Sequence, residues 1–211
     1  MKRGLFQTSF RTSLIMLAFV VLVTAVLALT YDKTHELIAK SEAEEKLALI
    51  NQVFPPGISD NDIIHDTIEI SPNELLGNTS PVTAYRARLK GKPAAVMIEA
   101  TAPDGYSGKI TLLIAILANG EISGVRVISH NETPGLGDYI DIAKSPWIRI
   151  FDHVSLDSVP DAAWHVKKDG GKFDYMTGAT ITPRAVVKAV HKALEYFAQN
   201  RASLFEERTG K

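Results

Sequence analysis

One long apolar run dominates the N-terminal part of the chain. Residues 14–31 carry no charged side chain and only two threonines. A helix rises about 1.5 Å per residue, so a helix of this length covers most of the hydrocarbon core of a bilayer. We therefore predict a transmembrane helix over residues 14–31, preceded by a short segment, residues 1–13. A cleaved signal peptide is the alternative, but the run is longer than the apolar core of most signal peptides.

The residues after the apolar run keep a helical pattern. Residues 32–54 are rich in strong helix formers, and Ala43, Leu47, Ile50 and Phe54 recur at helical spacing. A Pro-Pro-Gly sequence then ends the pattern, so we predict a stalk helix over residues 32–54. Three basic residues lie close to the apolar run on each side, and only the N-terminal side lacks acidic residues. This distribution gives a mild preference for an N-terminus inside the cell.

Strand signals follow a polar stretch, residues 58–80, which we interpret as loop with short elements. Four runs of β-branched and apolar residues, separated by turn residues, predict an antiparallel sheet. These runs are residues 82–90, 92–102, 109–120 and 121–130. Asn119-Gly120 lies between the last two and predicts a hairpin with a type I′ turn, because that turn needs positive φ angles at both residues.

The C-terminal part of the chain changes to a helical period that begins just after Pro183. The apolar residues that share one face of this helix are Val186, Val190, Ala193, Leu194 and Phe197. A sheet with helices packed on a face is an α+β arrangement. We therefore predict an α+β domain over residues 55–211.

Composition excludes several kinds of chemistry. The formal charge is only −1 and basic residues are spread along the chain, so we expect no nucleic-acid partner. The absence of cysteine excludes disulfides, cysteine-ligated metals and thiol nucleophiles. The six histidines form no pair at metal-ligand spacing, and neither a Walker-type phosphate loop nor a nucleophile elbow occurs. We therefore predict no metal site and no catalytic residue, and any redox chemistry must come from an organic cofactor.

Two glycine-containing segments are candidate ligand sites. Residues 130–138 read HNETPGLGD and predict a compact loop whose backbone can approach a flat ligand, with Glu132 and Thr133 as polar contacts. On chemistry alone, a turn into the next helix is the simpler interpretation. Residues 174–183 read DYMTGATITP and directly precede the C-terminal helix.

The second segment places a hydroxyl beside a helix start. Thr182 is a good N-cap candidate and Pro183 fits the first helical position, so Thr180 lies just outside the helix. Free backbone N–H groups and the helix dipole stabilise a phosphate at such a start. Gly178 and Ala179 leave room for a bulky group. A capped helix start without a ligand remains the simpler alternative at this point.

Both segments resemble a known family. HNETPGLGD, GYSGKI at residues 105–110 and the stretch 163–190 that contains TGATITP resemble the FMN-binding domain shared by the Rnf complex G subunit and the NqrC subunit of the sodium-pumping quinone reductase. The similarity extends from about residue 90 to about residue 197, and the family also has a single N-terminal anchor. The short chain and the TGATITPRAV string favour the G subunit, and NqrC is the alternative.

The resemblance implies a cofactor and a location. In this family the last threonine of the TGAT element carries FMN through its phosphate, which implies covalent FMN, as a phosphoester, on Thr180. Asp174 matches the acidic residue that begins the motif recognised by a dedicated flavin transferase, which installs FMN from FAD outside the cytoplasm. Residues 1–13 would then be cytoplasmic, and residues 55–211 a periplasmic FMN-binding domain anchored in a bacterial inner membrane. The further cofactor contacts that we predict are Thr177, Gly178, Ala179, Thr182, Glu132, Thr133, Gly135 and Leu136.

The implied function is electron transfer by a subunit that is not catalytic alone. The flavin would relay single electrons within a complex that couples ferredoxin and NAD redox chemistry to ion translocation. Its partners would be the other membrane and peripheral subunits, the flavin transferase during maturation, and the membrane. One alternative is a non-redox anchored binding module whose TGAT segment only caps a helix. A stand-alone flavin reductase is a second, for which the chain lacks a dinucleotide fingerprint.

Overall fold

A computed structural model describes the backbone of residues 2–206 and the side chains of residues 10–35 and 48–206. The chain forms two compact units that divide between Ala48 and Leu49. Two parts of the prediction lie outside the described residues. These are the side chains of Ala43 and Leu47 in the predicted stalk helix, and the end of the predicted domain beyond residue 206.

The first unit consists of one helix. Helix α1 extends without interruption over Lys2–Val53, and its last residues belong to the second unit. Within it, Phe10–His35 has a mean hydropathy of 2.7 and none of its residues is buried in the protein. This is the one helix of the described chain that is long and apolar enough to cross a membrane. It contains the run that predicted a transmembrane helix.

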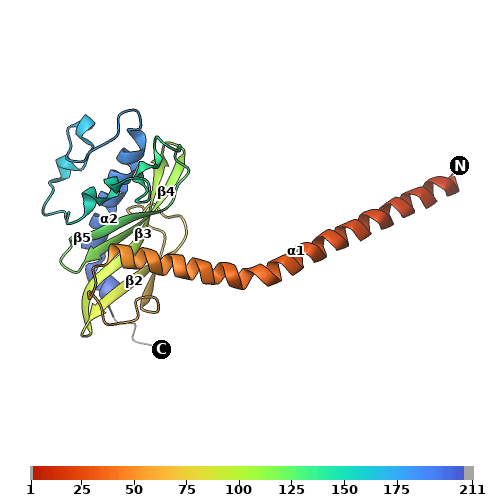
Figure 1. The fold of residues 1–211 in the computed structure, drawn as a ribbon, viewed down its shortest axis with the longest axis horizontal. Coiled ribbons are helices and arrows are strands. Elements are labelled where there is room, and N and C mark those ends of the chain that lie inside the picture. The colour runs from red at the N-terminus through yellow and green to blue at the C-terminus, as the bar shows by residue number, and fades with distance from the viewer. Residues whose placement is uncertain (1, 207–211) are drawn as a thin grey trace. The chain divides into compact units, whose positions relative to one another are not determined.

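The second unit is built on a five-stranded antiparallel meander in which each strand pairs with the next in the sequence (Figure 1). The strands are β1 Thr67–Ile70, β2 Val82–Leu89, β3 Lys92–Gly105, β4 Gly108–Leu117 and β5 Ile122–Ser129. The four predicted strands are therefore confirmed. β1 is one of the short elements expected within residues 58–80.

Both faces of the sheet are buried, which explains why its strands read as nearly unbroken apolar runs. Alternate side chains of a strand point to opposite faces. Those on the face that packs with helix α2, Ile181–Phe205, include Val96, Ile98, Ala100, Leu112, Ile114 and Ile116. Those on the opposite face, which packs with the end of α1, include Ala95, Met97, Leu113 and Ala115.

Helix α2 confirms the predicted apolar face, since the five residues named for that face are all buried. Its start differs from the prediction. The helix begins at Ile181 with Thr180 as the N-cap residue, so Thr182 and Pro183 occupy the second and third positions. Thr182 is therefore not the N-cap residue, and its hydroxyl donates to Glu132 instead. Proline is tolerated in a first turn because its missing N–H has no helical partner there.

The β4–β5 hairpin is present, but its turn is not type I′. Gly120 has a positive φ of 94°, whereas Asn119 is not among the described residues with positive φ. The Gly120 N–H donates to the Leu117 carbonyl at 2.8 Å, and the Leu117 N–H donates to the Glu121 carbonyl at 2.8 Å. This pattern is a three-residue loop in which glycine takes the left-handed bulge position.

The segment between β5 and α2 contains four short 3₁₀ helices. They are η1 Asp138–Ile140, η2 Pro146–Phe151, η3 Asp161–Ala163 and η4 Lys167–Asp169. Aromatic side chains from this segment, Trp147, Phe151, Trp164 and Phe173, pack into the core beside α2. The segment is thereby fixed over the sheet although it has little regular structure.

Candidate functional site

A small cavity of about 110 Å³ lies at the N-terminal end of α2. Three separate parts of the sequence line it: the β3–β4 turn, the loop after β5, and the residues around the start of α2. The lining residues are Tyr106, Glu132, Thr133, Leu136, Gly137, Gly178, Ala179, Thr180, Ile181 and Thr182. The fold therefore brings together the three segments that carried the family resemblance.

Thr180 is the residue between the TGAT turn and the helix. Its backbone carbonyl accepts the Arg184 N–H at 3.3 Å, while its side chain makes no capping hydrogen bond. The residue is 9% exposed and lines the cavity. Its hydroxyl is thus not used in helix capping, unlike that of a typical N-cap threonine.

The backbone around the start of α2 offers donors to an anion. The N–H groups of Ile181 and Thr182 lie in the first turn, where an α-helix provides no carbonyl partners. Pro183 contributes no N–H. The N-terminal end of the helix dipole adds a partial positive charge at the same place.

A tight turn holds Thr180 against this helix start. The Ala179 N–H donates to the Met176 carbonyl at 3.1 Å, and Gly178 has a φ of 93°, a value that favours glycine. The Met176 N–H donates to the Tyr139 hydroxyl at 3.2 Å. Burial raises the pKa of Tyr139 to about 12, so its hydroxyl stays protonated at ordinary pH. The turn is therefore supported from the core side.

The loop after β5 is closed by its own backbone. The Leu136 and Gly137 N–H groups both donate to the Thr133 carbonyl, at 3.1 and 3.0 Å. Gly135, with a φ of 75°, donates its N–H to Asp138 Oδ1 at 2.7 Å. A side chain built on Gly135 would meet no atom within 4 Å, so this glycine leaves an open surface.

Glu132 is the buried carboxylate of the site, with 4% exposure. Its Oε1 accepts the Ser107 N–H at 3.0 Å, and its Oε2 accepts the Thr182 hydroxyl. The Glu132 N–H donates to His130 Nδ1 at 3.1 Å. The carboxylate thus connects the β3–β4 turn with the first turn of α2.

Most of the predicted contacts lie in the cavity wall, but three predicted residues do not. Thr177 is exposed, and neither it nor Gly135 is among the residues that line the cavity. Asp174 is also exposed and pairs with Lys167 Nζ at 2.6 Å. Three residues that line the cavity were not among the predicted contacts: Tyr106, Gly137 and Ile181. The first belongs to GYSGKI and the second to HNETPGLGD, so the motifs indicated their neighbourhood.

The mouth of the cavity is apolar. The exposed large apolar side chains that line it are Tyr106, Leu136 and Ile181. An exposed apolar surface beside a few polar groups is typical of a site for a flat organic ligand. The cavity itself is too small for a whole nucleotide, because ligand pockets usually measure roughly 300–1,000 Å³.

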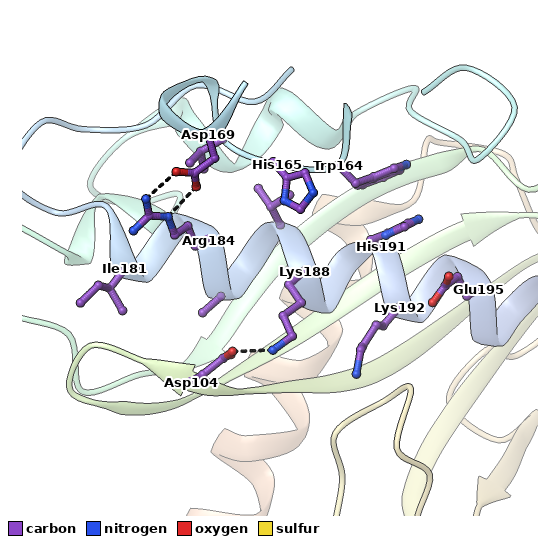
Figure 2. A pocket seen from close by; sticks show the side chains of 13 residues that line it. Asp104, Trp164, His165, Asp169, Ile181, Arg184, Lys188, His191, Lys192 and Glu195 are labelled. Atoms are coloured by element: carbon purple, nitrogen blue, oxygen red, sulfur yellow. Dashed lines mark hydrogen bonds and ion pairs between the residues drawn. The ribbon is translucent and has the colours of Figure 1, made fainter. Parts of the chain in front are cut away.

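A larger groove of about 570 Å³ runs along α2 and shares Ile181 with the first cavity (Figure 2). Figure 2 shows ion pairs across it, with Arg184 bound to Asp169 through two 2.6 Å hydrogen bonds and Lys188 bound to Asp104 at 2.7 Å. Trp164 and His191 stack in its wall, with ring centroids 4.7 Å apart. The ion pairs already satisfy these charges within the protein, so the groove makes a weaker ligand site than its size suggests.

No group of three or more His, Cys, Asp or Glu side chains that could hold a metal ion occurs within the described residues. The residues around Thr180 do fit FMN. The hydroxyl and helix N-terminus suit a phosphate, Gly135 leaves open surface, and the apolar mouth suits an isoalloxazine ring. The cofactor supplies reversible acceptance of one or two electrons.

Comparison with known proteins defines the class. A family model described as FMN-binding domain matches residues 105–195, and one described as RnfG N-terminal region matches residues 1–53. The chain is thus an FMN-binding-domain protein with an apolar N-terminal helix. The G subunit of the ion-translocating oxidoreductase complex of Pseudomonas aeruginosa (strain UCBPP-PA14) is 46% identical over 206 residues, which cover 97% of this chain and 96% of the relative.

Two further relatives carry the same description. The G subunit of Shewanella baltica (strain OS223) is 45% identical, over 97% of this chain and 95% of the relative. That of Pseudoalteromonas atlantica is 44% identical, over 92% of this chain and 91% of the relative. The chain belongs to the family of G subunits of ion-translocating oxidoreductase complexes. This confirms the resemblance to the G subunit over the alternative of an NqrC-like chain.

Proposed function

We propose that this chain carries FMN as a phosphoester on Thr180 and relays electrons within an ion-translocating oxidoreductase complex. One observation supports the attachment site most directly. A threonine hydroxyl that is not used for capping lies at a helix N-terminus, in a cavity lined by all three motif segments. The N–H groups of Ile181 and Thr182 would hold the phosphate there.

The attachment reaction balances with FAD as the donor. The Thr180 oxygen bonds to the phosphorus nearest the flavin, and the bond from that phosphorus to the bridging oxygen of the diphosphate breaks. AMP leaves, and the threonine proton passes to a base. No hydrogen bond to a base is found for the Thr180 side chain among the described residues, so a separate flavin transferase would supply that base.

The exposed acidic residue of the motif suits recognition by this enzyme. Asp174 is exposed and has only a surface partner, Lys167. Its backbone carbonyl accepts the Trp147 indole N–H at 2.8 Å, so the backbone is held in place while the side chain stays accessible at the surface. We expect Asp174 to contribute to transferase recognition and to have no part in electron transfer.

The flavin ring is expected against the loop after β5. Thr133 and Leu136 line the cavity there, and Gly135 and Gly178 present backbone without side chains. Thr177 and Ala179 complete the turn on the other side. In this position the ring would lie at an exposed apolar mouth, which allows close approach of a redox partner.

The membrane topology follows from the maturation reaction. With residues 14–31 in a bacterial inner membrane and residues 1–13 in the cytoplasm, the FMN-binding domain would be periplasmic. The partners would be the other membrane and peripheral subunits of the complex, which couples ferredoxin and NAD chemistry to ion movement. The chain alone would not turn over NADH.

Intact mass of the exported full-length chain tests the attachment. Co-expression with a flavin transferase should add the mass of one FMN unit, and Thr180→Ala should abolish the addition. Thr83→Ala, which removes an exposed hydroxyl on β2 outside the cavity, is the matched control and should keep the FMN. FMN on the Thr180→Ala chain, or an unmodified wild-type chain beside a flavinylated reference substrate, would refute the proposal.

The ring position needs a separate measurement. Thr133→Val and Leu136→Ala should shift the flavin absorbance or midpoint potential, because both residues line the proposed ring site. Trp164→Phe, in the larger groove, should leave both unchanged. The opposite pattern would place the ring in the groove along α2.

A further inference from the structure

Glu132 lies at the point where the motif segments meet. It receives hydrogen bonds from the Ser107 N–H of the β3–β4 turn and from the Thr182 hydroxyl in the first turn of α2. Both carboxylate oxygens are therefore occupied by donors from the protein. With 4% exposure, the side chain has little surface left for a ligand.

Two glycines lie against this carboxylate. A Cβ on Gly137 would lie 2.9 Å from Glu132 Oε2, its nearest neighbour. A Cβ on Gly105 would meet the Gly108 carbonyl oxygen at 2.3 Å and Glu132 Oε1 at 2.9 Å, so the backbone of the β3–β4 turn already requires glycine there. Gly137 does not have a positive φ, so the space around Glu132 is what requires glycine at that position.

We propose that Glu132 is a positioning residue for flavin attachment, and not a contact of the cofactor. The inference rests on the proposed attachment at Thr180. Through Thr182, Glu132 fixes the first turn of the helix whose N-cap is Thr180. Through Ser107 it fixes the turn that carries Tyr106 at the cavity mouth. A direct contact would place a carboxylate against a phosphate, and like charges repel.

This role needs hydrogen-bonding groups at position 132, but it does not need charge. A glutamine keeps the shape, can accept from the Ser107 N–H through its carbonyl oxygen and can donate to the Thr182 hydroxyl through its amide. A leucine of similar size can do neither. At position 182, serine keeps the hydroxyl and valine keeps only the shape.

The experiment measures the rate of FMN incorporation into the exported full-length chain, by intact mass after induction of the transferase. Glu132→Gln and Thr182→Ser should incorporate FMN at close to the wild-type rate. Glu132→Leu and Thr182→Val should be slower by about tenfold or more, because displacement of a reacting group by an ångström can cost up to a hundredfold. Amide exchange at Ser107 should accelerate in Glu132→Leu and stay unchanged in Glu132→Gln.

Val159→Ala is the control for loss of stability, since Val159 is fully buried in the core and does not line the cavity. It should incorporate FMN at the wild-type rate. Wild-type incorporation by Glu132→Leu would overturn the inference. So would slow incorporation by Glu132→Gln, which would indicate a need for the charge, or by Val159→Ala, which would indicate a general effect of instability. A wild-type chain that takes no FMN would instead refute the attachment site itself.

Discussion

Two glycines of the loop after β5 should respond differently to the same substitution. Gly135 has a φ of 75° and no atom within 4 Å of a built Cβ. Gly137 has an ordinary φ of −94°, but a built Cβ would lie 2.9 Å from Glu132 Oε2 and 3.1 Å from Thr182 Oγ1. Alanine therefore meets backbone strain at Gly135 and a steric clash at Gly137.

The expected costs can be worked from these environments. Left-handed backbone costs an alanine about 1–2 kcal/mol. Reduced freedom of the unfolded chain returns about 0.4–1 kcal/mol, so Gly135→Ala should destabilise by about 0.5–1 kcal/mol net. At Gly137 the Cβ must displace Glu132 or Thr182. Overpacking of this kind costs about 1–3 kcal/mol, and losing a buried hydrogen bond costs about 1–3 kcal/mol. The same return of about 0.4–1 kcal/mol from the unfolded chain applies, so we expect about 3 kcal/mol net.

Urea unfolding of the detergent-solubilised chain measures both costs. The chain has two tryptophans, Trp147 and Trp164, and both are buried in the core of the second unit. Their fluorescence therefore reports the unfolding of that unit. A double mutant of Gly137→Ala with Thr182→Ala should be less destabilised than the sum of the two, because the removed hydroxyl relieves part of the clash. The reasoning fails if Gly135→Ala is the more damaging change, or if the double mutant is strictly additive.

Two further predictions concern buried polar side chains. Burial raises the pKa of Tyr139 to about 12 in the folded protein, whereas the phenol of the unfolded chain ionises near pH 10. The free energy of unfolding should therefore fall by about 2–3 kcal/mol between pH 10 and 12. Comparison of urea midpoints at pH 9 and 11.5 checks this, and Tyr139→Phe should show a smaller decline. Arg126 donates to the Gln52 side chain and carbonyl at 3.1 and 3.0 Å, so Arg126→Met should destabilise the second unit by about 1.5–3 kcal/mol. An unchanged urea midpoint would show that the end of α1 does not need this contact.

Periodicity along the chain was sufficient to predict the strands and the apolar face of α2, because burial of one side of an element repeats at fixed spacing. The same reasoning failed where a tertiary partner competes with a local one. Thr182 is of a residue type that is common at the N-cap, yet its hydroxyl binds Glu132 and the helix begins before it, at Ile181. The turn prediction failed for a local reason, because Asn119-Gly120 fits a type I′ turn but a three-residue loop also takes glycine at its left-handed position, and of the two residues only Gly120 has a positive φ.

The candidate site could be predicted as a set of motifs, but the sequence did not show why each motif position needs its residue type. Gly135 and Gly178 adopt positive φ angles, Gly105 makes room for the Gly108 carbonyl, and Gly137 makes room for the Glu132 side chain. The residue type is the same in all four positions. The cause at Gly137 depends on Glu132, which is held by the Ser107 N–H of the β3–β4 turn, 25 residues away in the sequence.

The absence of a local base at Thr180 has a consequence for how the site works. A threonine hydroxyl is a weak nucleophile unless a base activates it. Within the described residues, the side chain of Thr180 is bound to neither a carboxylate nor an imidazole, and the nearby carboxylate of Glu132 is already occupied by two donors. For the proposed attachment at Thr180, activation of the hydroxyl would therefore have to come from the flavin transferase. Spontaneous flavinylation by free FAD should not occur, and this property would keep the cofactor from being attached before the chain reaches the compartment of the transferase.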